Sequence, residues 1–167
     1  MSVLTILGVD PGINKTGFGI IKITENNNPQ LSLYGHISTN SKKSLAERLQ
    51  KIYIKLEEII RENKPDILAI ESIFFSENVK TAIVMGHARG AAIVSGMNNG
   101  SEIAEYSPRE VKQSVVGSGA ASKSQVRYMV GQLLNTNENI QPDDASDALA
   151  VALCHWHKLK FSRLVTG

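Results

Sequence analysis

Apolar and polar positions in the first forty residues predict three strands. Residues 3–9 form a short apolar run, rich in β-branched side chains, that ends at a Pro-Gly turn. Residues 17–24 form a second candidate strand, and residues 31–39 alternate like a third. The intervening NNNPQ at 26–30 has the composition of a hairpin connection. The pattern therefore predicts an antiparallel meander.

After residue 40 the apolar period becomes helical. The segment 44–62 carries apolar side chains one turn apart, with charged residues between them: Leu45, Leu49, Ile52, Leu56, Ile59 and Ile60. Residues 65–71 and 102–106 are candidate strands, separated by a long helix over 78–97 that is rich in Ala and Gly. Strands that alternate with helices are typical of parallel crossovers, so the sequence predicts an α/β protein.

Capping signals mark the helices of the last third of the chain. SPRE opens the segment 107–115 with an N-cap serine, a proline at the first helical position and the glutamate of a capping box. SKSQ repeats this pattern at the start of 122–134, after the flexible loop GSGAA. A last helix is predicted from near Pro142 to about residue 158.

Composition narrows the class of protein. At 167 residues, with 42% hydrophobic and 20% charged residues, the chain is about one globular domain long. The net charge of +2 only mildly favours an anionic partner. Cys154, the single cysteine, excludes an internal disulfide, and the N-terminus lacks signal or membrane character. We expect a cytoplasmic protein without a membrane segment. It would have one domain over 1–158 and a basic tail over 159–167 that contacts DNA or stays disordered.

Four carboxylates stand where acids are costly. Asp10 and Glu71 each end an apolar strand, and Asp144 and Asp147 lie at the start of the last helix. Taken singly, most have ordinary explanations, because an Asp before Pro-Gly forms turns and a Glu after a strand can be the first solvated residue. Acids such as Asp143 and Asp144 also favour the first turn of a helix. Single residues therefore do not decide the question.

Asp147 is harder to explain as a structural residue. It follows Asp144 by three residues, so the two carboxylates are neighbours on one helix face. Residues 148–153 are apolar all round, which is typical of a buried helix. A buried carboxylate must be paired or must bind a metal, and no Lys or Arg lies one turn away.

Together the acids predict a metal site. The strands that end at Asp10 and Glu71 would be neighbours in this connectivity, and ligands gather beyond the carboxyl ends of such strands. The last helix would add Asp144 and Asp147 to the same crevice. An all-oxygen set suits Mg²⁺ or Mn²⁺, whereas zinc favours His or Cys. Two such ions about 3.5–4 Å apart can clamp the attacking water and the leaving oxygen of a phosphodiester.

Five segments resemble, in order and spacing, the motifs of RuvC-type Holliday junction resolvases. They are GVDPGINKTGFGI, DILAIESIFFSEN, HARGAAI, VKQSVVGSGAASKSQV and DDASDALAVALCH. The resemblance covers residues 4–157, and five blocks together are very specific. It implies an RNase H-like fold: a five-stranded mixed sheet whose first three strands are antiparallel, flanked by helices on both faces.

The resemblance also implies a function in recombination and repair. It implies a homodimeric, structure-selective DNA endonuclease that resolves four-way junctions by paired symmetric nicks, leaving 5′-phosphate and 3′-hydroxyl ends. Asp10, Glu71, Asp144 and Asp147 match the family's catalytic metal ligands, which implies two Mg²⁺ ions per active site, with Mn²⁺ as a substitute. A branch-migration helicase is implied as a partner.

Further residues match the family with open alternatives. Lys112 and Lys123 match basic positions near the DNA, and Lys123 could also offset charge in the transition state; a solvated helix face is the alternative. Phe74 matches a base-stacking aromatic, with core packing as the alternative and the better explanation for Phe75. Asp143 lies off the motif, as a helix-start acid or an outer-shell residue.

Two other motifs carry less weight. His87 and Arg89 lie in a region that helps to form the family's dimer, but packing within one chain explains them equally well. HWH at 155–157 is not a zinc site, because residues two apart on a helix do not share a face.

Three rival functions were weighed against the resolvase. DPGINKTG is similar to the first phosphate loop of actin-like kinases and ATPases, but those proteins need a second domain that 167 residues cannot supply. A non-catalytic DNA-binding module would be favoured by the loss of one acid, yet all four are present. An RNA–DNA hybrid nuclease keeps the acids, and only the resemblance at Phe74 and the lysines speaks against it.

Overall fold

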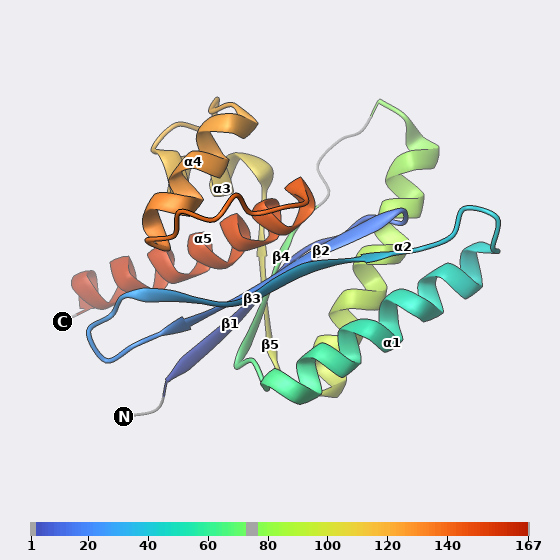
Figure 1. Ribbon diagram of the computed structural model, residues 1–167, viewed down its shortest axis with the longest axis horizontal. Coiled ribbons are helices and arrows are strands. Elements are labelled where there is room, and N and C mark those ends of the chain that lie inside the picture. The colour runs from blue at the N-terminus through green and yellow to red at the C-terminus, as the bar shows by residue number, and fades with distance from the viewer. Residues whose placement is uncertain (1–2, 73–76, 167) are drawn as a thin grey trace.

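The computed structural model describes residues 3–72 and 77–166. Within them lie five strands and five helices, in chain order β1 (Leu4–Asp10), β2 (Lys15–Ile23), β3 (Pro29–Ser38), α1 (Leu45–Asn63), β4 (Ile67–Glu71), α2 (Val79–Asn98), β5 (Glu102–Tyr106), α3 (Pro108–Val116), α4 (Lys123–Leu133) and α5 (Asp143–Thr166). Each strand and helix expected from the apolar pattern is present. Figure 1 shows their arrangement.

The five strands form one mixed sheet in the order β3-β2-β1-β4-β5. The pairs β1–β2 and β2–β3 are antiparallel, whereas β1–β4 and β4–β5 are parallel. This confirms the predicted meander and the parallel crossovers after it. Val9 pairs with Ile70 across β1 and β4, so the next residues, Asp10 and Glu71, end their strands side by side.

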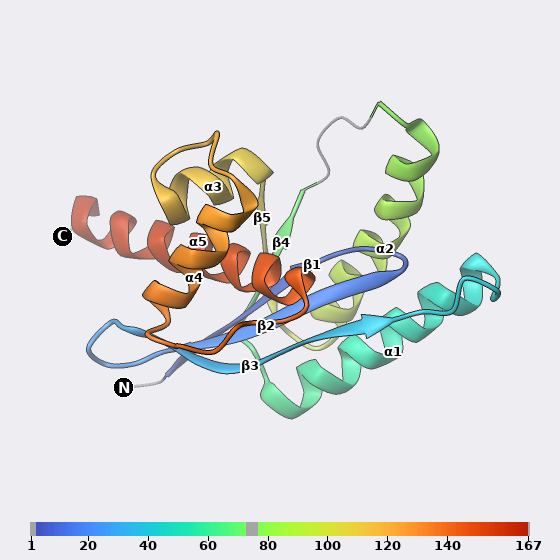
Figure 2. The same cartoon turned by 45° about the horizontal axis from the view of Figure 1, so that its top comes forward.

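Helices cover both faces of the sheet, as expected. Helices α3, α4 and α5 lie over one face, and α1 and α2 lie over the other (Figures 1 and 2). We refer to these as the α5 face and the α1–α2 face. Each has its own hydrophobic core, and the two cores are separated by the sheet.

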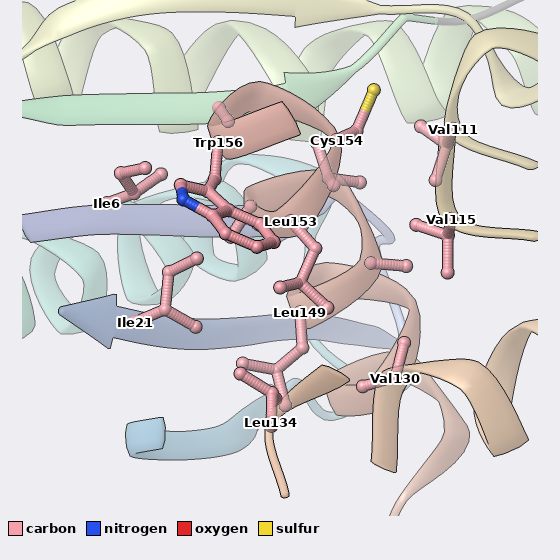
Figure 3. Packing of buried hydrophobic residues seen from close by; sticks show 14 of the residues in the cluster. Ile6, Ile21, Val111, Val115, Val130, Leu134, Leu149, Leu153, Cys154 and Trp156 are labelled. Atoms are coloured by element: carbon pink, nitrogen blue, oxygen red, sulfur yellow. The ribbon is translucent and has the colours of Figure 1, made fainter. Parts of the chain in front are cut away.

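The two cores differ in composition. On the α5 face, residues 148–156 of α5 are all buried. Leu149, Leu153 and Trp156 face Ile6 and Ile21 of the sheet, and Cys154 lies on the side of Val111 and Val115 of α3 (Figure 3). The α1–α2 face is built from large aliphatic side chains of the sheet and of α1, together with two alanines of α2: Leu7, Val9, Ile20, Ile37, Ile52, Leu56, Ile60, Leu68, Ile70, Ala88 and Ala92. The predicted burial of residues 148–153 in the last helix is confirmed.

Strand β3 begins at Pro29, inside the segment 26–30 that was predicted as a hairpin connection. The predicted end of the last helix, at about residue 158, is also wrong, because α5 continues to Thr166. No Gly or Pro interrupts residues 159–166, so nothing in the local sequence stops the helix before Gly167. Residues 159–166 thus extend α5 beyond its predicted end. Over the two described stretches, none of the helices is both long and apolar enough to span a bilayer.

Candidate active site

A pocket of about 360 Å³ opens at the sheet edge where β1 and β4 end. It is lined by Asp10, Pro11, Gly12, Lys15, Glu71, Met85, Pro108, Val111, Lys112, Lys123, Val126, Asp144, Asp147 and Ala150. The four predicted acids and both predicted lysines therefore share one pocket. Lys15, which the sequence analysis did not single out, adds a third lysine to its wall.

The turn after Asp10 is fixed by hydrogen bonds. The buried hydroxyl of Thr16 donates to the carbonyl oxygen of Gly12 at 2.8 Å, which closes the turn on itself. Arg48 of α1 donates through Nη2 to the carbonyl oxygen of Ile13 at 3.2 Å and to Oδ1 of Asn14 at 2.6 Å. Its Nε donates to Thr39 at 2.8 Å. The wall of the pocket after β1 is thus fastened to α1.

Two glycines allow α5 to reach the pocket. A Cβ at Gly8 of β1 would collide with the backbone carbonyl of Ala148, and one at Gly17 of β2 would collide with that of Asp144. Helix α5 therefore lies directly on the backbone of these two strands, closer than a packed side chain would permit. Because Gly17 pairs with Asp10, this contact brings the first turn of α5 beside the end of β1.

The four carboxylates interact within this pocket. Burial raises the pKa of Asp10 from 3.8 to about 8, and the negative charges of Glu71, Asp147 and Asp144 add to the shift. Lys123 opposes it only partly. A carboxylate in this position is unfavourable as an anion unless a positive charge joins the site. Asp10 is thus the point where the cluster lacks compensation most strongly.

Glu71 and Asp147 have raised pKa values for the same reasons. Burial is the largest cause for both, and Asp147 adds to the shift at Glu71. Lys123 lowers the pKa of both acids, and Lys112 acts on Glu71 in the same direction. The Nζ atom of Lys123 lies 3.6 Å from Oδ2 of Asp147. Three of the four acids therefore share one electrostatic environment with the predicted lysines.

The donor chemistry fits a hard divalent cation, although the carboxylates do not converge on a ready-made site. Among residues 3–72 and 77–166, no three His, Cys, Asp or Glu side chains are placed to hold a metal ion together. The pocket is nonetheless lined by four carboxylates, and the raised pKa of Asp10 means that added positive charge would favour its ionised form. All-oxygen donors and unbalanced negative charge fit Mg²⁺ or Mn²⁺.

Comparison with known proteins decides the family. The model of the family described as "Crossover junction endodeoxyribonuclease RuvC" matches residues 6–155. This chain belongs to the RuvC family. It is therefore a crossover junction endodeoxyribonuclease, a phosphodiester hydrolase, as expected from the sequence.

Relatives and solved structures agree with the RuvC assignment. A crossover junction endodeoxyribonuclease RuvC of Alkaliphilus oremlandii is 50% identical over 161 residues, which covers 96% of this chain and 98% of the relative. A Thermus thermophilus RuvC structure matches with a TM-score of 0.87 at 29% identity, covering 95% of this chain and 97% of that one. The same RuvC in complex with Holliday junction substrate matches with a TM-score of 0.85 at 28% identity, covering 95% and 96%. The RNase H-like fold is thereby confirmed.

The remaining predicted residues of this RuvC chain have mixed outcomes. Phe74 and Phe75 lie outside the described residues. Arg89 pairs with Glu105 of β5, at 2.6 Å between Nη2 and Oε1, which is a contact within the chain. His87 is exposed and its ring contacts the carbonyl oxygen of Ile83 at 2.8 Å.

Three contacts were not predicted from the sequence. Asp143, which the sequence left unassigned, pairs with Arg127 of α4, at 2.5 Å between Oδ1 and Nη2. His155 of the HWH motif contacts the hydroxyl of Tyr106 at 2.6 Å and is buried. His157 contacts the carbonyl oxygen of Ser114 at 3.0 Å. The two histidines thus pack against different partners, which agrees with the rejection of a zinc site.

Proposed function

We propose that this RuvC-family chain resolves four-way DNA junctions with a metal-dependent site formed by Asp10, Glu71, Asp144 and Asp147. The observation that carries the proposal is the single pocket lined by all four carboxylates, in which the pKa of Asp10 is raised to about 8. The related T. thermophilus RuvC, which has the same fold, is known in complex with Holliday junction substrate.

The acids would hold two Mg²⁺ ions, for which Mn²⁺ can substitute. When bound, the ions would activate the attacking water and stabilise the leaving oxygen, giving 5′-phosphate and 3′-hydroxyl ends. Asp10 and Glu71 stand on strand ends and Asp144 and Asp147 on a buried helix, so the backbone is in place and the four side chains would have to converge when the ions bind. The ammonium group of Lys123, beside Asp147, would offset charge that develops on the phosphate.

Three residues are proposed to contact the DNA. Lys112 and Lys123 line the pocket from α3 and α4, on the side opposite the turn after β1, and would bind backbone phosphates. Phe74 lies three residues beyond Glu71 in the sequence, where an aromatic side chain could stack on an unpaired base. Phosphate contacts position the junction, and stacking would favour a branched structure over a linear duplex.

A homodimer is supported by an apolar stripe on α2. Val79, Ile83, Val94 and Met97 are exposed at helical spacing. Gly90 lies between them, and among the described residues no heavy atom beyond the adjacent helix backbone comes within 4 Å of the place that its Cβ would occupy. The fold of one chain therefore does not require a glycine there, whereas close approach of a second copy would. Two sites related by symmetry would place paired nicks in strands of like polarity.

The cellular setting of the proposal follows from the reaction. The enzyme would act in the cytoplasm, on junctions that arise in recombination and repair, together with a branch-migration helicase. Residues 1–158 would act as one nuclease domain, with the last turns of α5 as an appendage.

The test is a cleavage assay with three substrates. The protein is incubated with a synthetic four-way junction, a linear duplex of the same sequence and an RNA–DNA hybrid, each with Mg²⁺ or with EDTA. We expect symmetric nicks in the junction, only with Mg²⁺, and at least about 100-fold slower cutting of the other substrates. Efficient cutting of the hybrid would instead favour the RNA–DNA nuclease.

Variants separate metal binding from junction binding. Asp10→Asn should abolish cleavage and keep junction affinity, since a carboxylate without metal repels phosphate. Phe74→Ala should slow resolution more than it weakens binding. Resolution of the junction by Asp10→Asn would show that the proposed metal site is wrong, and an unchanged rate for Phe74→Ala would exclude stacking.

A further inference from the structure

Two ion pairs join α4 to α5 in a regular arrangement. Lys123 lies 3.6 Å from Asp147, and Arg127 lies 2.5 Å from Asp143. The two residues on each helix are four apart, which places them one above the other on the same face. The first residue of one helix pairs with the second of the other, so the pairs are the two rungs of an antiparallel ladder. We call it the α4–α5 ladder.

The two rungs differ in rigidity. The side chain of Lys123 is 77% exposed, and its ammonium group ends a flexible stem. The side chain of Arg127 is only 36% exposed, and its planar guanidinium loses less freedom when it is bound. In the part of the chain that the structure describes, the buried Nε of Arg127 has no hydrogen-bond partner, so its pairing rests on Asp143. The Arg127–Asp143 rung is therefore the more fixed of the two.

In the described residues, the start of α4 is held by its N-cap, by core contacts and by the two ion pairs. The chain enters the helix from a loop that begins at Gly117, in the left-handed region with φ 87°, and the cap at Ser122 is local. Val126 and Val130 pack into the core and fix how closely α4 lies against the domain. Packed side chains resist sliding of the helix, and a charged hydrogen bond adds a restraint of defined length and direction. The ion pair can thus help to fix the axial position of α4.

We propose that Arg127 and Asp143 are positioning residues that hold Lys123 at the catalytic pocket. The proposal rests on the proposed function, in which Lys123 acts on the phosphate. Neither residue lines the pocket, so neither is assigned a direct part in the reaction. Loss of either partner would let the start of α4 shift and would move the ammonium group away from its place beside Asp147.

An effect of charge alone makes a different prediction. The negative charge of Asp143 contributes to the raised pKa of Asp147, so it does reach the site. If only this field mattered, removing a positive charge at Arg127 and a negative charge at Asp143 would change the rate in opposite directions. The ladder requires both changes to slow the reaction. The sign of the two effects therefore separates the explanations.

The test measures single-turnover cleavage of a four-way junction with saturating protein and Mg²⁺. Arg127→Gln and Asp143→Asn should each slow cleavage by about tenfold, and the double variant should be no slower than either. In a Lys123→Ala background, neither change should slow cleavage further. The conservative pair Arg127→Lys with Asp143→Glu should recover to within about threefold of the unmodified rate. Arg61→Gln, which breaks an ion pair within α1, is the matched control and should have no effect.

The outcomes distinguish this proposal from the proposed function. If Lys123→Ala slows cleavage but the Arg127 and Asp143 variants do not, the ladder is wrong and the role of Lys123 stands. Opposite signs, or effects that multiply with Lys123→Ala, also overturn it. If Lys123→Ala cleaves at the unmodified rate, the proposed role of Lys123 fails and nothing remains to be positioned. Thermal unfolding of each variant checks that a slow rate is not a loss of fold, which would count against a positioning role.

Discussion

The two faces of the sheet hold their helices at different distances. On the α1–α2 face, α1 packs through Ile52, Leu56 and Ile60, so a layer of large side chains separates it from the strands. On the α5 face, the helix backbone lies against Gly8 and Gly17. The close contact brings two carboxylates of α5 beside a strand end, which a helix on a layer of side chains could not do. The spacing of a helix from the sheet thus decides where charge can be placed.

The close contact between α5 and the sheet can be disrupted most directly at Gly8. Gly8→Ala would force a methyl group against the backbone of Ala148, and we expect a loss of about 3 kcal/mol or more in the free energy of unfolding. Urea unfolding followed through the fluorescence of Trp156, the single tryptophan, measures it. Gly131→Ala is the control, because a Cβ there would lie at an ordinary 3.6 Å from its neighbour. Equal midpoints for Gly8→Ala and the unmodified protein would contradict the close contact.

Charge on the α5 face should also make its stability depend on pH. The pKa of Asp10 is raised from 3.8 to about 8, so the folded state binds more protons than the unfolded state between these values. Stability in EDTA should therefore fall as the pH rises from about 4 to about 8, and Asp10→Asn should remove a few kcal/mol of that loss. Thermal unfolding at a series of pH values measures the difference between the two proteins.

The effect of Asp10 is obtained by subtracting the pH dependence of stability of Asp10→Asn from that of the unmodified protein. Burial lowers the pKa of His155 and His157, and these groups favour the folded state as the pH rises, opposite to Asp10. Their contribution cancels when Asp10→Asn is compared with the unmodified protein. Leu56→Ala, on the α1–α2 face, should lower stability equally at every pH. If stability plotted against pH ran parallel for Asp10→Asn and the unmodified protein, the pKa of Asp10 would not be raised in the folded state.

A larger side chain on the exposed side of α2 should weaken dimer formation without destabilising the single chain. Gly90→Leu adds a side chain to an exposed position with free space, so the unfolding of a single chain should change by less than about 0.5 kcal/mol. The dissociation constant of the proposed dimer should rise about tenfold to 100-fold. Sedimentation velocity measures it, with Gln132→Leu on α4 as the control. A dimer as tight as that of the unmodified chain would exclude the α2 stripe.

The smallest effect is expected at the end of α5. Phe161, Leu164 and Val165 are exposed, so removing residues 161–167 should change the free energy of unfolding by less than about 0.5 kcal/mol. Removing residues 156–167 also takes away the buried Trp156 and should cost about 3–5 kcal/mol. Chemical unfolding of the two truncated proteins compares them. A large loss from the shorter truncation would place the domain boundary beyond residue 158.

Local signals in the sequence were sufficient for most of the fold. The capping boxes at Ser107 and Ser122 are present as expected, because they depend only on residues three apart. The end of α5 was missed because its last turns are helical without being buried, so the apolar pattern ends before the helix does. The spacing of apolar residues indicates which positions are buried, and the last turns of α5 are helical but exposed.

The residues that line the site could be predicted from the sequence, but the contacts that hold them in place could not. Asp10 and Glu71 were brought together correctly because the strand order follows from connectivity. Gly8 and Gly17 were overlooked, although a glycine inside a strand can signal a close backbone approach. The partnership of Asp143 with Arg127 joins two elements through tertiary packing, and no local pattern encodes it.

The guanidinium of Arg48 links the pocket to the α1–α2 face of the sheet. It holds the turn after β1 from α1, while the opposite wall, with Asp144 and Asp147, belongs to α5. One wall of the pocket is therefore attached to the layer of α1, and another is formed by α5 in the layer on the other face of the sheet. A change in the distance between the two layers would therefore change the distance between the turn after β1 and the two carboxylates of α5.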